Sequence, residues 1–201
     1  MNTTVVAGRS FLNLLAEFLV FFFGIGVFIV PSSLPFNWWM LPSVSALLFL
    51  MEYRNGDRKN LRPALLVGTF LLVFDFIFEN VGTKIFGFWG CYNSSFFVLA
   101  VPIEVMLTCF LGGSAWCMYT LSVSADVAIK FKNKFDKSIV YPLILLDLVF
   151  FGIGGSVAEW CLRQRGLMYY SNGWTMLYAF ISYFAVWFIL HIITNFLKPP
   201  T

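Results

Sequence analysis

FDFIFENVGTKIFGFWGCYNSSFFVLAVPIEVMLTCFLGGS, residues 74–114, places three acidic side chains beside or inside long apolar runs. These are Asp75, Glu79 and Glu104, and a loop rich in glycine, aromatic and small polar residues separates the third acid from the first two. Ionisable groups are costly at membrane depth, and where they occur they usually mark functional sites. The stretch therefore predicts membrane-spanning helices with a functional site between them.

The composition of the whole chain is that of a membrane protein. Of its 201 residues, 60% are hydrophobic, 20% are aromatic and only 11% are charged, whereas about a quarter of the residues of a soluble domain are charged. The net charge is only +3, and the basic residues lie between the apolar runs, so we interpret them as topology signals and not as a nucleic-acid surface. We expect a single transmembrane helical domain over residues 1–201.

Six apolar runs predict about six transmembrane helices, because each is long enough, or nearly so, to cross a hydrocarbon core of about 30 Å. The runs cover residues 11–30, 38–53, 63–82, 96–121, 139–160 and 174–196. The second is marginal in length, and the first is expected to stay as an anchor because it lacks a small-residue cleavage site. With a cytoplasmic N-terminus, ten of the 13 Lys and Arg residues fall on the inner side. The positive-inside rule thus predicts a multi-pass protein of the cell membrane with both termini cytoplasmic.

This topology places two similar loops on the outer side, at residues 79–95 and 159–174. Each loop starts with a glutamate at a helix end, passes through glycine, reaches a tyrosine and ends in asparagine and serine. The parallel suggests an internal repeat of two helical hairpins. Cys91 and Cys161 fall in these loops, and the sequence leaves open whether they form a disulfide or remain free thiols.

Acidic residues within or at the ends of the apolar runs are the candidates for chemistry. They are Glu17, Asp75, Glu79, Glu104, Asp147 and Glu159, and no Lys or Arg interrupts any of the six runs. A carboxyl group without a cationic partner in apolar surroundings favours its neutral form, so it can serve as a proton donor. Asp75 and Glu79 share one helix face at i and i+4, which allows one to hold a proton while the other is ionised. The alternative for each acid is a hydrogen bond to a neighbouring helix or a place near the interface, and it applies most to Glu17 and Glu159.

The proline, cysteine, histidine and lysine positions limit the kinds of site that the chain can form. Pro102 is expected to kink the fourth helix around Glu104 and to open a pocket there. We expect no metal site, because the four cysteines form no CxxC pair and the chain has one histidine, His191, which we interpret as a packing residue. The absence of lysine from the runs also excludes a retinal Schiff base.

The stretch from residue 74 to residue 106 resembles the membrane-embedded carotenoid-biosynthesis proteins, which include the small-subunit lycopene cyclase domains and the related carotenoid hydratases. The shared features of this stretch are Asp75, the loop residues Gly87, Trp89 and Tyr92, and Pro102-Ile103-Glu104. The second loop is similar to the aromatic loop of the hydratases through Gly166, Tyr169, Tyr170 and Asn172-Gly173-Trp174. The cyclase pattern has a second glutamate directly after the first, and this chain has Val105 there, which puts cyclase activity itself in question.

The resemblance implies an isomerase or lyase that acts on a carotenoid or another polyisoprenoid without a cofactor. A carboxylic acid would protonate a double bond, aromatic faces would shelter the carbocation, and a carboxylate would remove a proton or water would add, which gives cyclisation or hydration. Glu79 and Glu104 are the best candidates for acid and base, with Asp75, Asp147 and Glu159 in support. The expected substrate contacts are Phe78, Phe88, Trp89, Tyr92, Asn93, Tyr169, Tyr170, Asn172 and Trp174. The expected partner is a membrane lipid or isoprenoid substrate, and the chain is compatible with a homo- or hetero-oligomer.

A small transporter or channel is the main alternative. The same carboxyl groups would then bind or relay a proton or a cation across the bilayer. A non-catalytic lipid-binding subunit is a third interpretation. The enzyme is favoured because the acids concentrate toward the outer half of the predicted helices.

Overall fold

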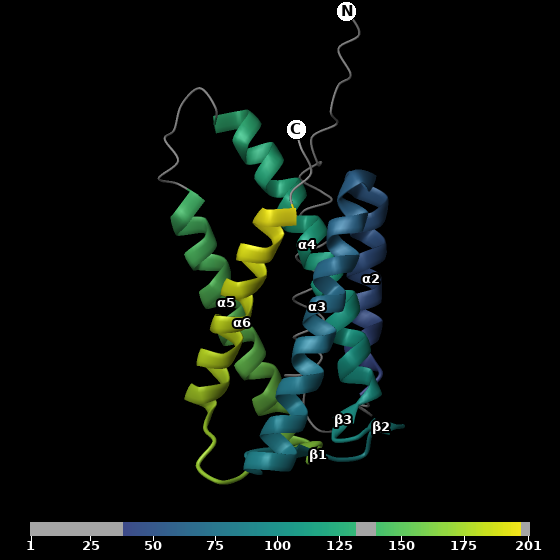
Figure 1. The fold of residues 1–201 in the computed structure, drawn as a ribbon, viewed down its shortest axis with the longest axis vertical. Coiled ribbons are helices and arrows are strands. Elements are labelled where there is room, and N and C mark those ends of the chain that lie inside the picture. The colour runs from purple at the N-terminus through teal and green to yellow at the C-terminus, as the bar shows by residue number, and fades with distance from the viewer. Residues whose placement is uncertain (1–37, 132–139, 198–201) are drawn as a thin grey trace, which may run out of the picture.

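The protein is mostly helical in the computed structural model, which describes residues 38–131 and 140–197 (Figure 1). The helices of the described residues are α2 (Met40–Asn55), α3 (Leu61–Asn80), α4 (Ile103–Phe131), α5 (Val140–Gln164) and α6 (Met176–Leu197). Four helical segments of these described residues are long and apolar enough to cross a membrane: Arg58–Phe86, Ile103–Ser122, Ile144–Gln164 and Met176–Leu197. The prediction of a helical chain with apolar helices of membrane-spanning length is therefore confirmed.

The first two predicted runs have different outcomes. The run at 11–30, with Glu17, lies outside the described residues. The run at 38–53 forms α2, whose 16 residues make about 24 Å of helix, less than the hydrocarbon core of about 30 Å. A short 3-10 helix, η1 (Arg58–Asn60), then leads from α2 into α3.

Two predicted loops are wrong at their boundaries. The chain stays helical beyond α3 through a π-helix, η2 (Val81–Phe86), although the sequence predicts that the helical run ends at residue 82. The polar stretch predicted at 122–138 is also helical in its first part, because α4 continues to Phe131. Residues 122–131 contain neither glycine nor proline, so nothing in that segment breaks the helix.

The predicted kink at Pro102 is wrong as well. Pro102 lies in β3 (Val101–Pro102), which pairs with β2 (Phe97–Val98), and α4 begins only at Ile103. Proline has no N–H group and disfavours a helical conformation of the preceding residue, so the helix starts after it. Glu104 therefore lies in the first turn of α4 and not beside a break within it.

Small residues allow α3 and α4 to pack closely. A Cβ atom at Gly113 would lie 3.4 Å from the Cα atom of Gly68, so the two backbones meet without side chains between them, as is common in membrane helices. Around this crossing lies a buried core from α3, α4 and α6. It consists of Ala64, Val67, Leu71, Trp116, Cys117, Met118, Leu121 and Leu190.

The two predicted outer loops meet at one end of the helices, which confirms that they lie on the same side. Strand β1 (Trp89–Cys91) pairs antiparallel with β4 (Met168–Tyr170). Because β1 follows α3 and β4 follows α5, each helical hairpin contributes one strand. Figure 1 shows these strands at the lower end, opposite the last turns of α2 and α6.

The outer surface of the helices is apolar. Only 11% of the most apolar window of α6 is buried, and its exposed side chains include Leu177, Ile181 and Phe188. A patch of this kind is unfavourable in water but is the normal surface of a helix in lipid. The environment that fits this face is the hydrocarbon core of a bilayer.

Candidate functional site

Three carboxyl groups of α3 and α5 lie within electrostatic range of one another, and we call Asp75, Glu79 and Glu159 the carboxyl cluster. Asp75 and Glu79 lie one turn apart on α3, as predicted, and both are close enough to Glu159 of α5 to interact electrostatically with it. All three side chains are partly buried. The tertiary structure thus joins the pair predicted on one helix to an acid 80 residues further along the chain.

Glu79 is held by the indole of Trp89. The Nε1 atom of Trp89 donates a hydrogen bond of 2.6 Å to Oε2 of Glu79, and the Trp89 side chain is almost fully buried. Gly82 makes this approach possible, because a Cβ atom there would collide with the Trp89 indole. The turn that follows α3 therefore positions the tryptophan over the helix face that carries Glu79.

Glu159 accepts hydrogen bonds from two phenols. The hydroxyl groups of Tyr170 in β4 and Tyr183 in α6 both donate to its carboxylate. Burial and the negative charge of Glu159 both raise the pKa of Tyr170 above its ordinary value, so the phenol keeps its proton and remains a donor. The guanidinium of Arg163 lies 4.1 Å from the centre of the Tyr170 ring, where a cation–π contact fixes the ring.

Asp75 differs from the other two acids because one of its oxygens has no partner. Its carboxyl group interacts with the thiol of Cys109 in α4. Its second oxygen, Oδ2, is buried and forms no hydrogen bond within the described part of the chain. Buried polar atoms are nearly always paired, so this oxygen is the one best placed to meet a ligand.

Four aromatic rings border the carboxyl cluster, and we call Phe78, Phe88, Trp89 and Trp174 the aromatic wall. The ring centroids of Trp89 and Trp174 are 4.5 Å apart, those of Phe88 and Trp174 are 5.3 Å apart, and those of Phe78 and Trp89 are 5.4 Å apart. All four were predicted substrate contacts, and the structure brings them together. Their faces offer a surface that attracts positive charge.

The other predicted substrate contacts lie on the exposed side of the loops, except Tyr170. Tyr92 and Tyr169 stack on each other with ring centroids 5.1 Å apart, and about half of each side chain is exposed. Asn93 and Asn172 adopt left-handed backbone conformations with φ of 57° and 47°. The Nδ2 atom of Asn172 donates to the Phe86 carbonyl over 2.8 Å, so its amide ties the two loops together.

Glu104 lies in a separate setting. Its side chain is fully buried, and it accepts hydrogen bonds from Ser94 Oγ at 2.5 Å and from the Ser95 backbone N–H at 3.0 Å. These bonds fix the loop between β1 and β2 to the first turn of α4. The geometry favours a structural task for this acid, and its predicted catalytic role stays a prediction.

Asp147 is also apart from the carboxyl cluster. Its Oδ2 atom lies 2.7 Å from Nε2 of His191 and accepts a hydrogen bond of 3.2 Å from Nε1 of Trp116. Phe151 lies one turn after Asp147 on α5, and its ring packs on Trp187 with centroids 4.4 Å apart. The Phe151–Trp187 pair thus lies between the Asp147–His191 contact and Glu159 along the interface of α5 and α6.

A glycine sets the spacing between Glu159 and its tyrosine. A Cβ atom at Gly155, one turn before Glu159, would collide with the ring of Tyr183. We therefore expect Gly155→Ala to displace Tyr183 and to lower the free energy of unfolding by about 1–3 kcal/mol through overpacking. Thermal unfolding in detergent measures this loss.

The matched control for that substitution is Gly112→Ala. A Cβ atom at Gly112 would lie 3.4 Å from Ser45 Oγ and 3.9 Å from Ser45 Cβ, so the added methyl group fits with little movement. The control should be neutral or slightly stabilising because alanine favours a helix more than glycine does. Equal unfolding temperatures for the two variants would show that Tyr183 is not confined by Gly155.

The four cysteines and the other side chains that could bind a metal ion form neither a disulfide nor a metal site within the described part of the chain. All four cysteines are free thiols, including Cys91 and Cys161, for which the sequence left a disulfide open. Burial raises the pKa of Cys91, and the charges of Glu79, Glu159 and Asp75 raise it further. Within residues 38–131 and 140–197, no group of His, Cys, Asp and Glu side chains is arranged to hold a metal ion.

Sequence reasoning missed three residues of the site, Cys109, Tyr183 and Arg163. Cys109 and Tyr183 lie in apolar helices, and no motif or spacing marks them. Only the packing of α4 and α6 against α3 and α5 reveals their role. No protein-family model, curated protein or solved structure matches the chain.

Proposed function

We propose that the protein is a membrane enzyme that acts on a carotenoid-like or other polyisoprenoid lipid by acid–base chemistry without a cofactor. The observation that supports this most is the carboxyl cluster bordered by the aromatic wall, where proton donors and acceptors adjoin faces that attract a carbocation. The apolar outer surface suits a substrate that arrives from the bilayer. The resemblance to carotenoid-biosynthesis proteins supports the same class of reaction.

In the proposed reaction Asp75 is the acid. Its free Oδ2 atom delivers a proton to one carbon of a substrate double bond, which forms a C–H bond and leaves a tertiary carbocation on the neighbouring carbon. The face of the aromatic wall stabilises this cation. Proton transfer by a positioned carboxyl group accelerates such steps by about 10²–10⁴-fold.

Glu159 is the proposed base. Two phenol donors stabilise its carboxylate form. In cyclisation, a second double bond attacks the cation, a C–C bond closes the ring, and Glu159 takes the proton lost from the adjacent carbon. In hydration, water attacks the cation and Glu159 takes a proton from the water. Transfer of that proton back to Asp75, with Glu79 between them, restores the starting state.

The departure at Val105 fits this assignment of roles. Val105 packs against the buried cluster that contains Trp89 and Cys161, so the position where the cyclase pattern has its second glutamate is apolar here. This chain therefore cannot use two adjacent glutamates after Pro102 as acid and base. The proposal gives that work to the acids of α3 and α5.

We also propose that residues 1–201 form six spans with both ends of this sequence on the cytoplasmic side. The basic residues Arg54, Arg58 and Arg62 lie at the end of the helices opposite β1 and β4. The positive-inside rule favours this end as the cytoplasmic one. The carboxyl cluster would then lie near the outer surface of the membrane.

Mass spectrometry of lipids that co-purify with the protein tests the proposed function. We expect a polyisoprenoid at near-equimolar amount, and we expect Trp174→Ala to lower its occupancy because the substitution removes part of the aromatic wall. Tyr92→Ala is the matched control, since Tyr92 is an exposed aromatic residue outside that wall. Recovery of only bulk phospholipid from the wild type and from Tyr92→Ala would contradict the proposal.

The transporter alternative predicts a polar route across the bilayer. Between Glu159 and Asp147 the ring centroids of Phe151 and Trp187 lie 4.4 Å apart, and this apolar contact favours the enzyme over the transporter. Proton flux into liposomes that disappears in Glu79→Gln and Glu159→Gln would nevertheless favour the transporter over the enzyme.

A further inference from the structure

A groove at the end of the molecule opposite the strands is not part of the candidate site. One cavity of about 370 Å³ lies between the start of α3 and the end of α6, lined by Lys59, Arg62, Pro63, Leu66, Phe196 and Leu197. A second cavity of about 270 Å³ continues along α3 past Leu65 and Thr69, and it shares Arg62 and Leu66 with the first. We call the two cavities together the α3–α6 groove.

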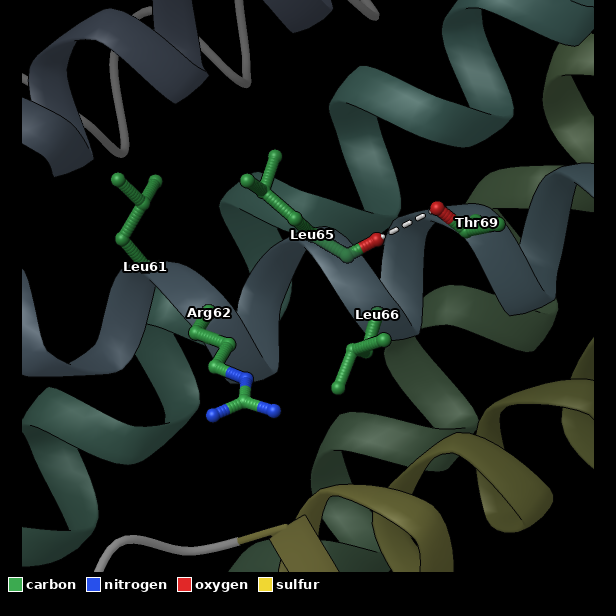
Figure 2. A pocket seen from close by; sticks show the side chains of 5 residues that line it. All are labelled: Leu61, Arg62, Leu65, Leu66 and Thr69. Atoms are coloured by element: carbon green, nitrogen blue, oxygen red, sulfur yellow. Dashed lines mark hydrogen bonds between the residues drawn. The ribbon is translucent and has the colours of Figure 1, made fainter.

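The walls of the groove are apolar. Leu66 is about half exposed and Phe196 is 81% exposed, so these side chains are open to the surroundings of the protein. Thr69 adds no polar group to the wall, because its hydroxyl donates to the Leu65 carbonyl over 2.8 Å. Figure 2 shows this bond and shows that the Arg62 guanidinium reaches away from α3 without an interaction with the other residues of the cavity.

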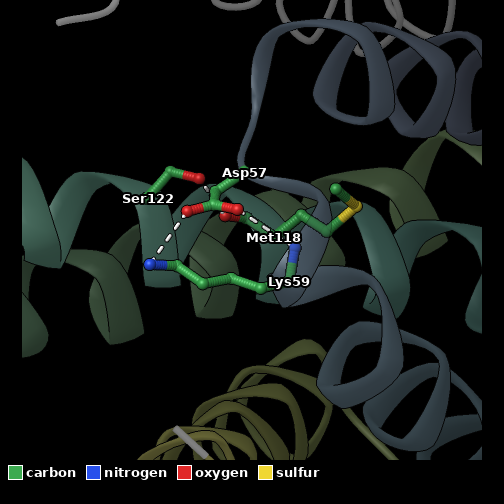
Figure 3. Close-up of polar contacts among 4 residues, drawn as sticks. All are labelled: Asp57, Lys59, Met118 and Ser122. Atoms are coloured by element: carbon green, nitrogen blue, oxygen red, sulfur yellow. Dashed lines mark hydrogen bonds and ion pairs between the residues drawn. The ribbon is translucent and has the colours of Figure 1, made fainter. Parts of the chain in front are cut away.

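Arg62 places a positive charge at this groove. No hydrogen bond or ion pair joins its guanidinium to another residue of the described chain. Lys59, by contrast, forms an ion pair with Asp57 at 3.0 Å, and Asp57 also accepts from the Lys59 backbone N–H (Figure 3). The nearby acid is thus already neutralised, which leaves a net positive charge at the mouth of an apolar groove.

The depth of these residues matches the layers of a lipid. Arg62 is in the first turn of α3, and Leu66 lies four residues later, about 6 Å further along the helix axis. A charged group at the helix end lies at headgroup level, and an apolar side chain about one turn deeper lies at acyl-chain level. Arg62 is therefore at the level of a lipid phosphate, and Leu66 is at the level of the acyl chain.

We propose that the α3–α6 groove binds one anionic phospholipid, with its phosphate on Arg62 and one acyl chain against Leu66 and Phe196. The guanidinium offers a fork of donors that suits a phosphate group. Phosphatidylglycerol carries a net negative charge and fits this arrangement, whereas in phosphatidylcholine a fixed cation offsets the phosphate charge. The bound lipid is separate from the substrate of the carboxyl cluster, because the two sites lie at opposite ends of the helices.

Native mass spectrometry of the full chain in detergent, titrated with phosphatidylglycerol or phosphatidylcholine, tests the proposal. Wild-type protein should bind one phosphatidylglycerol in preference to phosphatidylcholine, and Arg62→Gln should weaken phosphatidylglycerol binding about tenfold, as expected for the loss of a charge-assisted hydrogen bond. Arg62→Lys should retain part of the affinity. Leu66→Trp, which fills the groove and keeps the charge, should also weaken binding.

Arg54→Gln is the matched control, because Arg54 is an exposed arginine at the same end of the molecule and does not line the groove. An equal loss of binding in Arg54→Gln and Arg62→Gln would show general attraction of lipid to a basic surface and would overturn the site. Displacement of phosphatidylglycerol by millimolar inorganic phosphate would also overturn it, because the ligand would then be a free anion. Thermal unfolding of each variant checks that its fold is retained.

Discussion

Asp75→Asn is expected to lower the turnover of a polyisoprenoid substrate by at least about 100-fold. Asparagine matches the shape of aspartic acid but cannot deliver a proton, so the general-acid contribution of about 10²–10⁴-fold is lost. Folding should be nearly unaffected, because the amide still occupies the same space beside Cys109. The measurement is the rate of product formation in proteoliposomes that contain lycopene as the first probe, followed by liquid chromatography and mass spectrometry.

The product mass also identifies the reaction. Cyclisation leaves the mass of the substrate unchanged, whereas hydration adds one water. Asp57→Asn is the control, since Asp57 is an exposed acid in an ion pair with Lys59 at the other end of the molecule. Wild-type turnover by Asp75→Asn would show that Asp75 is not the general acid. Glu79 and Glu104 would then be the remaining candidates for that role.

Glu104→Ala is expected to lower the free energy of unfolding by about 3 kcal/mol. The substitution leaves the Ser94 hydroxyl and the Ser95 N–H without their acceptor and opens a cavity at a fully buried position. For a chain of this size the unfolding temperature should fall by about 6–12 °C. Thermal unfolding in detergent measures the shift.

Glu104→Gln separates the structural task from a catalytic one. The glutamine oxygen can still accept from the Ser95 N–H, so we expect a smaller loss of stability, about 1 kcal/mol, and turnover close to that of the wild type. A stable Glu104→Gln protein without turnover would instead support the catalytic role that the Pro102-Ile103-Glu104 motif suggested.

Sequence reasoning found the acids of the site more completely than their partners. Asp75 and Glu79 were paired from their spacing alone, because an interval of four residues fixes a shared helix face. Glu159 was recognised as an acid at a helix end, but its distance to the other two depends on where the fold places α5 relative to α3. Glu104 could not be separated from the pair, since sequence proximity does not reveal that Ser94 and Ser95 fold back to bond it.

The same contrast applies to the helices. Long apolar runs predicted α3, α5 and α6 within a few residues, because burial of backbone polar groups in lipid leaves few alternatives to a helix. The start of α4 was misplaced because residues 96–102 are also apolar, and apolar composition does not distinguish a strand from a helix. The pairing of β2 with β3 depends on hydrogen bonds between segments and is not a property of either segment.

The stretch at residues 74–114 by itself determined that this chain places acids beside or inside long apolar runs and that glycine and aromatic residues separate them. Only the tertiary structure decided which acids meet. The pairing of β1 with β4 places Trp89, which binds Glu79, opposite Tyr170, which binds Glu159, and the close contact at Gly155 brings Tyr183 to the same carboxylate as Tyr170. The physical reason is that helix periodicity fixes neighbours along one segment, whereas the neighbours of a site come from packing between segments far apart in the chain.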